Sequence, residues 1–167
     1  LSLWMPLAEK GNIQAQNAIG MLYFEGAGVM KSYQKASFWW LKSASQGNSQ
    51  AQNTLGTLYN QGMGVPKDYK EAVRWFRLSA DQENPDAQFN LATMYQKGLG
   101  LVQNLQKAIK WFKLAASRGD GPSQHKLGEI FENGVGTEKN ITKAMKWYHL
   151  AASNKHIMSQ VVLGKKY

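Results

Sequence analysis

One segment of this chain recurs without gaps at a spacing of 36 residues. The copies read GNIQAQNAIGMLY at 11–23, GNSQAQNTLGTLY at 47–59, ENPDAQFNLATMY at 83–95 and GDGPSQHKLGEIF at 119–131. A fifth copy, KHIMSQVVLGKKY, occupies 155–167. A period of 20–50 residues indicates a repeat architecture, in which each unit buries its apolar side against its neighbours.

The second half of each copy is equally regular. It contains an alanine and a tryptophan in fixed register, and every tryptophan is followed by a second aromatic residue. The alanines are Ala36, Ala72, Ala108 and Ala144. The aromatic pairs are Trp39–Trp40, Trp75–Phe76, Trp111–Phe112 and Trp147–Tyr148.

Each copy is predicted to form two helices. The first begins after a side chain that accepts hydrogen bonds from free backbone N–H groups, and it ends at a pair of glycines, which tolerate positive φ. These N-caps are Asn12, Asn48, Asn84 and Asp120, and the pairs are Gly26/Gly28, Gly62/Gly64, Gly98/Gly100 and Gly134/Gly136. The second helix has the N-caps Ser32, Asp68, Asn104 and Asn140. Turns this short place consecutive helices antiparallel, so we predict an all-α fold of tandem helix–turn–helix repeats.

The spacing also predicts the domain organisation, a single repeat domain over 1–167. Residues 1–11 form the second helix of a partial repeat, and residues 156–167 begin another first helix. The full repeats are 12–47, 48–83, 84–119 and 120–155. Because solenoid ends normally need polar caps, we expect a fragment of a longer repeat protein, or alternatively end-to-end stacking on a second chain.

A small residue recurs in the middle of each first helix, at Gly20, Gly56, Ala92, Gly128 and Gly164. Glycine there costs up to about 1 kcal/mol relative to alanine. A recurrent cost indicates a recurrent reason, so we expect a neighbouring helix to approach closely, with the recurrent alanine opposite.

Composition limits the function further. Hydrophobic residues make up 43% of the 167 residues, which indicates a globular chain. There is no cysteine, which excludes disulfides and thiolate chemistry but leaves cytoplasm, periplasm and secretion all open. No apolar run is long enough to cross a membrane. The net charge of +9 is compatible with an acidic partner, nucleic acid or acidic lipid.

The pattern AxxxLGxxYxxGxGVxxDYxxAxxWF, as it stands from Ala51 to Phe76, resembles the Sel-one-like repeat family, a relative of the tetratricopeptide repeats. The resemblance covers essentially the whole chain, and GVPKDY at 64–69 is especially similar to the family's loop. Copy three departs with Ala92 and GLGLVQNL, and copy four with Phe131 and GVGTEKNI. The resemblance implies a right-handed superhelix that serves as an adaptor in protein complexes; many bacterial members act at the envelope or in host contact.

The resemblance also implies that the first helices line the concave surface. The residues opposite their core face share a register but differ between copies, so packing does not dictate them and recognition of a protein or peptide can use them. In copies one and two they are Gln14, Asn17, Met21, Phe24, Gln50, Asn53, Thr57 and Asn60. In copies three and four they are Asp86, Phe89, Thr93, Gln96, Pro122, His125, Glu129 and Glu132. Phe24, Met21 and Phe89 are the strongest candidates, because exposed apolar groups often mark interfaces. The competing interpretation is a solvated surface, with these three packed against the next repeat.

An alternative binding surface lies on the second helices, where basic residues follow i, i+3, i+6 spacing. They are Arg74, Arg77, Lys107, Lys110, Lys113, Lys143 and Lys146. Such a ridge attracts phosphates, and binding of nucleic acid or an anionic surface is the alternative function. The sequence disfavours nucleic acid, because exposed aromatic residues for base stacking do not alternate with these lysines and no nucleic-acid motif occurs.

Catalytic and cofactor motifs are not indicated. A helix precedes each GxG and no third glycine follows, which excludes a dinucleotide fingerprint. The histidines at 125, 149 and 156 occupy different repeat positions, so no metal site is predicted. Glu129 and Glu132 share a helix face but lack a positioned partner, which favours surface charge. We therefore predict a protein-interaction scaffold that is not an enzyme, with no cofactor, metal or small-molecule substrate.

Overall fold

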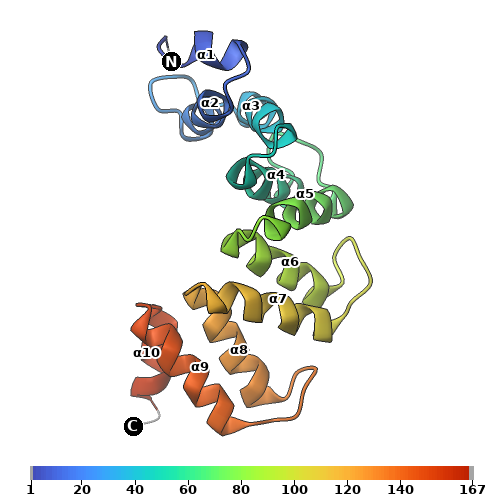
Figure 1. Ribbon diagram of the computed structural model, residues 1–167, viewed down its shortest axis with the longest axis vertical. Coiled ribbons are helices and arrows are strands. Elements are labelled where there is room, and N and C mark those ends of the chain that lie inside the picture. Colours follow the sequence, from blue (N-terminus) through green and yellow to red (C-terminus); the bar gives the residue numbers. More distant parts are fainter. Residues whose placement is uncertain (1, 166–167) are drawn as a thin grey trace. The chain divides into compact units, whose positions relative to one another are not determined.

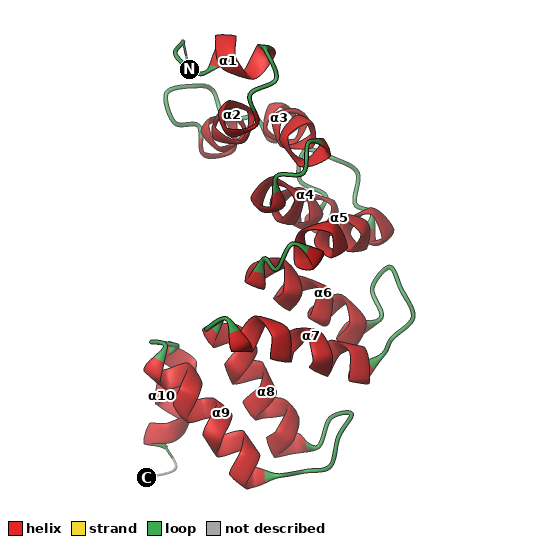
Figure 2. Cartoon of the chain, viewed as in Figure 1, coloured by secondary structure: helices red, strands yellow, loops and turns green. Residues whose placement is uncertain are grey.

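The computed structural model describes residues 2–165, and all of its regular structure over that range is helical (Figures 1 and 2). The elements up to residue 81 are α1 (Met5–Glu9), α2 (Ile13–Glu25), α3 (Tyr33–Ser45), α4 (Ser49–Gln61) and α5 (Tyr69–Asp81). The later elements are α6 (Pro85–Lys97), α7 (Leu105–Ser117), α8 (Gly121–Asn133), α9 (Ile141–Ser153) and α10 (Ile157–Gly164). The prediction of an all-α fold of tandem helix–turn–helix repeats is confirmed.

The predicted N-caps begin the helices. Asn12, Asn48 and Asp120 accept hydrogen bonds from the backbone N–H three residues ahead, at 2.8–2.9 Å. Ser32, Asp68, Asn104 and Asn140 cap α3, α5, α7 and α9 in the same way. Because each cap satisfies a backbone donor that the helix leaves unpaired, these residues fix where α2 to α5 and α7 to α9 start.

The glycine pairs form the loop that joins the two helices of a repeat. All eight glycines have φ between 67° and 75°, the left-handed region. In two repeats the second glycine also contacts the preceding repeat: a Cβ at Gly64 would collide with the backbone carbonyl of Tyr33. Ser37 Oγ donates to Gly64 O at 3.3 Å, and Gln106 Nε2 donates to Gly136 O at 2.6 Å. The loops that contain Gly64 and Gly136 are therefore also contacts between consecutive repeats of the same unit.

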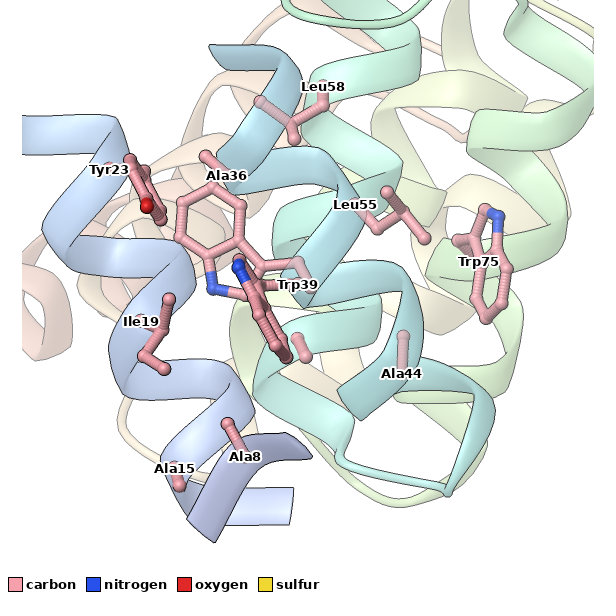
Figure 3. Packing of buried hydrophobic residues seen from close by; sticks show 12 residues of the cluster. Ala8, Ala15, Ile19, Tyr23, Ala36, Trp39, Ala44, Leu55, Leu58 and Trp75 are labelled. Carbon is pink, nitrogen blue, oxygen red and sulfur yellow. The ribbon is translucent and has the colours of Figure 1, made fainter. Parts of the chain in front are cut away.

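The chain divides into two compact units, the first ending at Asn84 and the second beginning at Pro85. In the first unit, α2 to α5 enclose a core of alanine, leucine and aromatic side chains (Figure 3). Ile19 and Leu55 contribute from the first helices and Trp39 and Trp75 from the second, and all four are at least nine-tenths buried. The second unit has the equivalent core, with Leu91, Phe112 and Leu127 fully buried.

The small residue in mid-helix faces an aromatic ring rather than the recurrent alanine. A Cβ built on Gly20, Gly56 or Gly128 would lie 2.5–2.7 Å from the ring atoms of Trp40, Phe76 or Tyr148. The close approach was predicted correctly, but its partner is the second aromatic residue of each pair. The ring needs the space because it crosses from the second helix onto the first helix of the same repeat.

A buried glutamine connects consecutive repeats. The amides of Gln16, Gln52 and Gln124 donate to the carbonyls of Ala8, Ala44 and Ala116, near the end of the preceding second helix, at 2.9–3.0 Å. Each amide oxygen accepts in turn from a side chain 30 residues later, which is Gln46, Gln82 or Asn154, at 2.7–2.8 Å. We call this three-part arrangement the glutamine staple; it gives each carbonyl a second hydrogen bond, beside the one from the backbone N–H of Gly11, Gly47 or Gly119.

Candidate functional site

The first-helix face is the set of predicted binding residues on α2, α4, α6 and α8, which occupy four register positions. Residues of the first position are Gln14, Gln50, Asp86 and Pro122, and all are exposed. Asn48 Nδ2 donates to Gln14 Oε1, and Asn84 Nδ2 to Gln50 Oε1, both at 3.5 Å. In the first unit this position therefore extends across the start of the next repeat.

The second position packs on the second aromatic of its own repeat. The ring centroids of Phe89 and Phe112 are 5.5 Å apart, and those of His125 and Tyr148 are 5.3 Å apart. Asn17 is half-buried at this position, whereas Asn53 is buried with 7% exposure. These side chains thus present one edge to solvent at most.

The fourth position flanks the same aromatic ring from the other side. Phe24 lies 5.3 Å from Tyr33 and 5.4 Å from Trp40, measured between ring centroids. Asn60, Gln96 and Glu132 occupy this position in the other repeats and are half-buried. The alternative to recognition at Phe24 and Phe89 was packing against the next repeat. Both rings instead pack within their own repeat.

In the fourth repeat, the residue at the fourth position contacts the second aromatic residue through a hydrogen bond instead of through apolar packing. Tyr148 Oη donates to Glu132 Oε2 at 2.7 Å. Burial, and then this hydrogen bond, raise the pKa of the Tyr148 phenol well above its usual value, so the hydroxyl stays a donor. The carboxylate of Glu132 is thereby held on the face of α8.

The third position is the outward one. Met21 is 43% exposed, and Thr57, Thr93 and Glu129 are half-buried. The hydroxyls of Thr57 and Thr93 donate to carbonyls one turn earlier in their own helices, at 3.2 and 3.0 Å. These side chains are less accessible than the exposed residues of the first position, and Met21 is the exposed one among them.

A histidine cluster joins α8 to α10 in the second unit. His125 Nδ1 lies 2.8 Å from Ser159 Oγ, and the rings of His125 and His156 are 4.7 Å apart. His125 Nε2 is 3.6 Å from Glu129 Oε1, and Lys126 Nζ donates to the other carboxylate oxygen, Glu129 Oε2, at 2.6 Å. Burial lowers the pKa of His125, and the neighbouring His156 and Lys126 act in the same direction while Glu129 opposes them. Among residues 2–165, no three histidine, aspartate or glutamate side chains are grouped so as to hold a metal ion.

The seven basic residues of the predicted ridge are all exposed on the second helices. Arg74 is paired with Glu71 at 3.0 Å. Lys107 and Lys143 extend over the rings of Tyr95 and Phe131, at 5.5 and 5.6 Å from the centroids. The ridge therefore includes residues that contact the first helices as well as residues that face solvent.

Three surface hollows lie along the second helices. The α5 hollow, about 350 Å³, is lined by Lys70, Val73, Arg74, Arg77, Leu78 and Asp81. The α7 hollow, about 420 Å³, is lined by Gln106, Ile109, Lys110, Lys113, Leu114 and Ser117. The α9 hollow, about 270 Å³, is lined by Lys143, Lys146, Trp147 and Leu150. Sequence reasoning identified the cations but missed the apolar residues between them, although the recurrence of leucine at 78, 114 and 150 is visible in the sequence.

Comparison with protein families identifies four consecutive copies of the Sel1 repeat. They cover residues 13–48, 49–84, 85–120 and 121–156. No helix among the described residues is long and apolar enough to span a membrane.

Solved structures of bacterial repeat proteins are similar to this chain. A protective antigen of uropathogenic Escherichia coli, which displays an SLR fold, is 33% identical with a TM-score of 0.93, and the match covers 97% of this chain and 35% of the antigen. A Sel1 repeat protein from Oxalobacter formigenes is 35% identical with a TM-score of 0.90, over 94% of this chain and 64% of that one. The chain thus spans about a third of the first relative and just under two thirds of the second.

A more distant similarity extends to the cysteine-rich protein B of Helicobacter pylori. It is 21% identical with a TM-score of 0.57, over 71% of this chain and 90% of that protein, and shows the shared fold alone. No curated protein sequence matches the chain.

Proposed function

Because the chain belongs to the Sel1 repeat family, we propose that it is a non-catalytic scaffold that binds a protein partner on the first-helix face. The observation that carries this proposal is the contrast between the core and the third register position. The core residues repeat from copy to copy, whereas the third position holds Met21, then threonine at 57 and 93, and then Glu129, which differ in size and charge.

Packing against other helices does not explain which residues occupy the third position. The two threonines bond only within their own helices, and Met21 leaves 43% of its surface in water. An exposed methionine flanked by the half-buried Phe24 provides an adaptable apolar contact of the kind found at protein interfaces. In the second unit the equivalent positions of α8 hold the acidic Glu129 and Glu132, so the first helices of the two units offer a partner different chemistry.

Site-specific photocrosslinking tests this proposal. A photoreactive phenylalanine analogue is placed singly at Met21, Thr57 or Thr93, and the full chain is irradiated in extracts of the organism that makes it. We expect the same partner to be crosslinked from the first-helix positions. Leu41, which is 41% exposed on α3, serves as the control position and is expected to give no such product.

A charge variant completes the test. The substitution Thr57→Arg, in the same unit as Met21, is expected to abolish the crosslink from Met21 while leaving the helical circular dichroism unchanged. Crosslinks formed from Leu41 alone, or retained in full by the Thr57→Arg variant, contradict binding on the first-helix face.

A further inference from the structure

The α7 and α9 hollows lie in the same compact unit and combine lysines with apolar residues. On α7, Lys110 and Lys113 stand beside Ile109 and Leu114. On α9, Lys143 and Lys146 stand beside Trp147 and Leu150. Both helices belong to the unit that begins at Pro85 and are the second helices of consecutive repeats, α7 in yellow and α9 in orange in Figure 1.

The positive charge of the lysines in these two hollows is not neutralised by acidic residues of the same hollow. No acidic side chain lines either of them. The α5 hollow in the first unit differs, because Asp81 lines it and its Arg74 is paired with Glu71. The sequence shows the same asymmetry: twelve basic and five acidic residues lie from residue 85 onward, against eight and six before it.

The leucines in the hollows recur although they are not fully buried. Leucine occupies the equivalent positions 78, 114 and 150, with Leu78 41% exposed, Leu150 43% exposed and Leu114 half-buried, whereas Ile109 of the α7 hollow is buried. Packing explains repetition at a buried position, but a leucine that keeps two fifths of its surface in water is available for an external contact. Trp147, half-buried, widens the apolar part of the α9 hollow.

We propose that the α7 and α9 hollows form a second docking surface, which takes an acidic amphipathic segment of a protein partner. Leucine or aromatic side chains of that segment fill the hollows, and its aspartate and glutamate side chains pair with Lys110, Lys113, Lys143 and Lys146. This surface lies on the second helices and is independent of the first-helix face.

The apolar lining distinguishes this partner from a nucleic acid. Phosphate recognition requires N–H donors throughout, and base stacking requires exposed aromatic faces. The hollows offer aliphatic carbon beside the lysines, and Trp147, the one aromatic residue that lines them, is half-buried. Burial of an aliphatic side chain in these hollows is favourable, whereas contact with apolar carbon does not stabilise a bound phosphate.

Fluorescence anisotropy with defined probes tests the proposal on the full chain. The probe is a labelled helical peptide with leucines at i, i+3 and i+7 on one face and glutamates on its flanks. The comparison probes are the same peptide with serine for every leucine, a poly-glutamate of equal length, and a single-stranded DNA of similar charge. At roughly physiological salt we expect the leucine peptide to bind at least about tenfold more tightly than any comparison probe.

Three variants identify the surface. Lys110→Glu with Lys146→Glu is expected to weaken binding of the leucine peptide by about tenfold or more, and Leu150→Ser by about fivefold. Lys97→Glu with Lys139→Glu makes the same charge change outside the hollows, and less than about a twofold effect is expected because salt screens distant charges. Thr93→Arg, on the first-helix face, is expected to leave peptide binding unchanged, so failure of one surface is distinguishable from failure of the other.

Each contrary result overturns the proposal. Equal binding of the serine peptide or poly-glutamate shows a purely electrostatic surface, and equal or tighter binding of the DNA shows a nucleic-acid surface. An equal loss in the Lys97/Lys139 control places the peptide elsewhere. Circular dichroism confirms that every variant is folded before binding is measured.

Discussion

At the scale of single residues, equivalent positions in two repeats can differ in whether they contact a neighbouring repeat. Gly28 and Gly64 are equivalent, with φ of 71° and 72°. A Cβ on Gly28 meets nothing within 4 Å, whereas on Gly64 it meets the backbone at the start of α3. The pair therefore separates the cost of a left-handed backbone from the cost of a contact between repeats.

Gly28→Ala is expected to lower the free energy of unfolding by about 1–2 kcal/mol, the usual penalty for an L-residue in the left-handed region. Gly64→Ala is expected to cost about 3 kcal/mol or more, because displacement of the first turn of α3 adds to the same strain. Urea denaturation of both variants measures the difference. Equal losses in the two variants contradict the loop-to-helix contact.

The glutamine staple gives a second residue-scale prediction. Gln52→Leu removes one of the two hydrogen bonds to the Ala44 carbonyl, which also accepts from Gly47 N–H, and one of the two acceptors of the Gln82 amide, so a loss of about 0.5–1.5 kcal/mol is expected. Gln50→Leu, an exposed change on the same helix, is expected to stay within about 0.5 kcal/mol. A neutral Gln52→Leu in thermal or urea unfolding argues that the staple stabilises nothing.

At the scale of helices, the connection between repeats has a glycine at some junctions and a larger residue at others. Gly119 before α8 has φ of 85°, and the equivalent Lys155 before α10 has φ of 62°. Lys155→Gly is expected to stabilise α10 by up to about 1 kcal/mol, and Gly119→Lys to destabilise the second unit by about 1–2 kcal/mol. Hydrogen exchange of the α10 amides measures the first change and urea denaturation the second. Changes of the same sign in both variants are incompatible with this account.

The docking of α10 is also expected to depend on pH. Burial lowers the pKa of His125, so the folded state favours the neutral imidazole, and its contribution to stability is present above the ordinary pKa of 6.5. That contribution is lost as pH falls through 6.5 toward the lowered folded-state value. Urea midpoints measured from about pH 8 to pH 5 are therefore expected to decline below about pH 6.5. His125→Asn, which restores the residue of the equivalent positions 17 and 53, is expected to flatten the decline; an unchanged slope assigns it to other groups.

At the scale of the whole chain, the charge is unevenly distributed. Residues from 85 onward carry most of the net charge of +9, and self-repulsion among like charges destabilises a compact state. Added salt screens this repulsion, so hydrogen exchange in α7 and α9 is expected to slow more than in α3 and α5 between roughly 0.05 and 0.5 M NaCl. An equal or larger effect in α3 and α5 is the result that contradicts it.

The sequence predicted the helical repeats because their signals are local. Caps such as Asn48 and Asp68 and the positive-φ glycines act on neighbouring backbone groups, so a regular spacing reveals them directly. The glutamine staple was missed although glutamine recurs at 16, 52, 88, 124 and 160, because a polar residue on a helix is ordinarily read as solvated.

The sequence predicted which residues of the candidate surfaces share a helix face, but not how deeply each of them is buried. Helical spacing placed Asn53 and Thr57 on one face, but not the depth to which a neighbouring ring buries each of them. Asn53 is 7% exposed and Thr57 is half-buried, and at the position of Asn53 the rings of Phe89 and His125 pack on the second aromatic residue of their own repeats. Such depth depends on the tilt between two helices, which no local pattern encodes.

The glutamine staple has an evolutionary consequence. Its acceptor lies eight residues before the glutamine and its donor 30 residues after it, so each staple is complete within the length of one repeat and the turn before it. An in-frame genetic duplication or loss of 36 residues therefore returns every staple to a chemically equivalent neighbour. Copy number can change between lineages without any compensating substitution, while the surface residues diverge independently in each new copy.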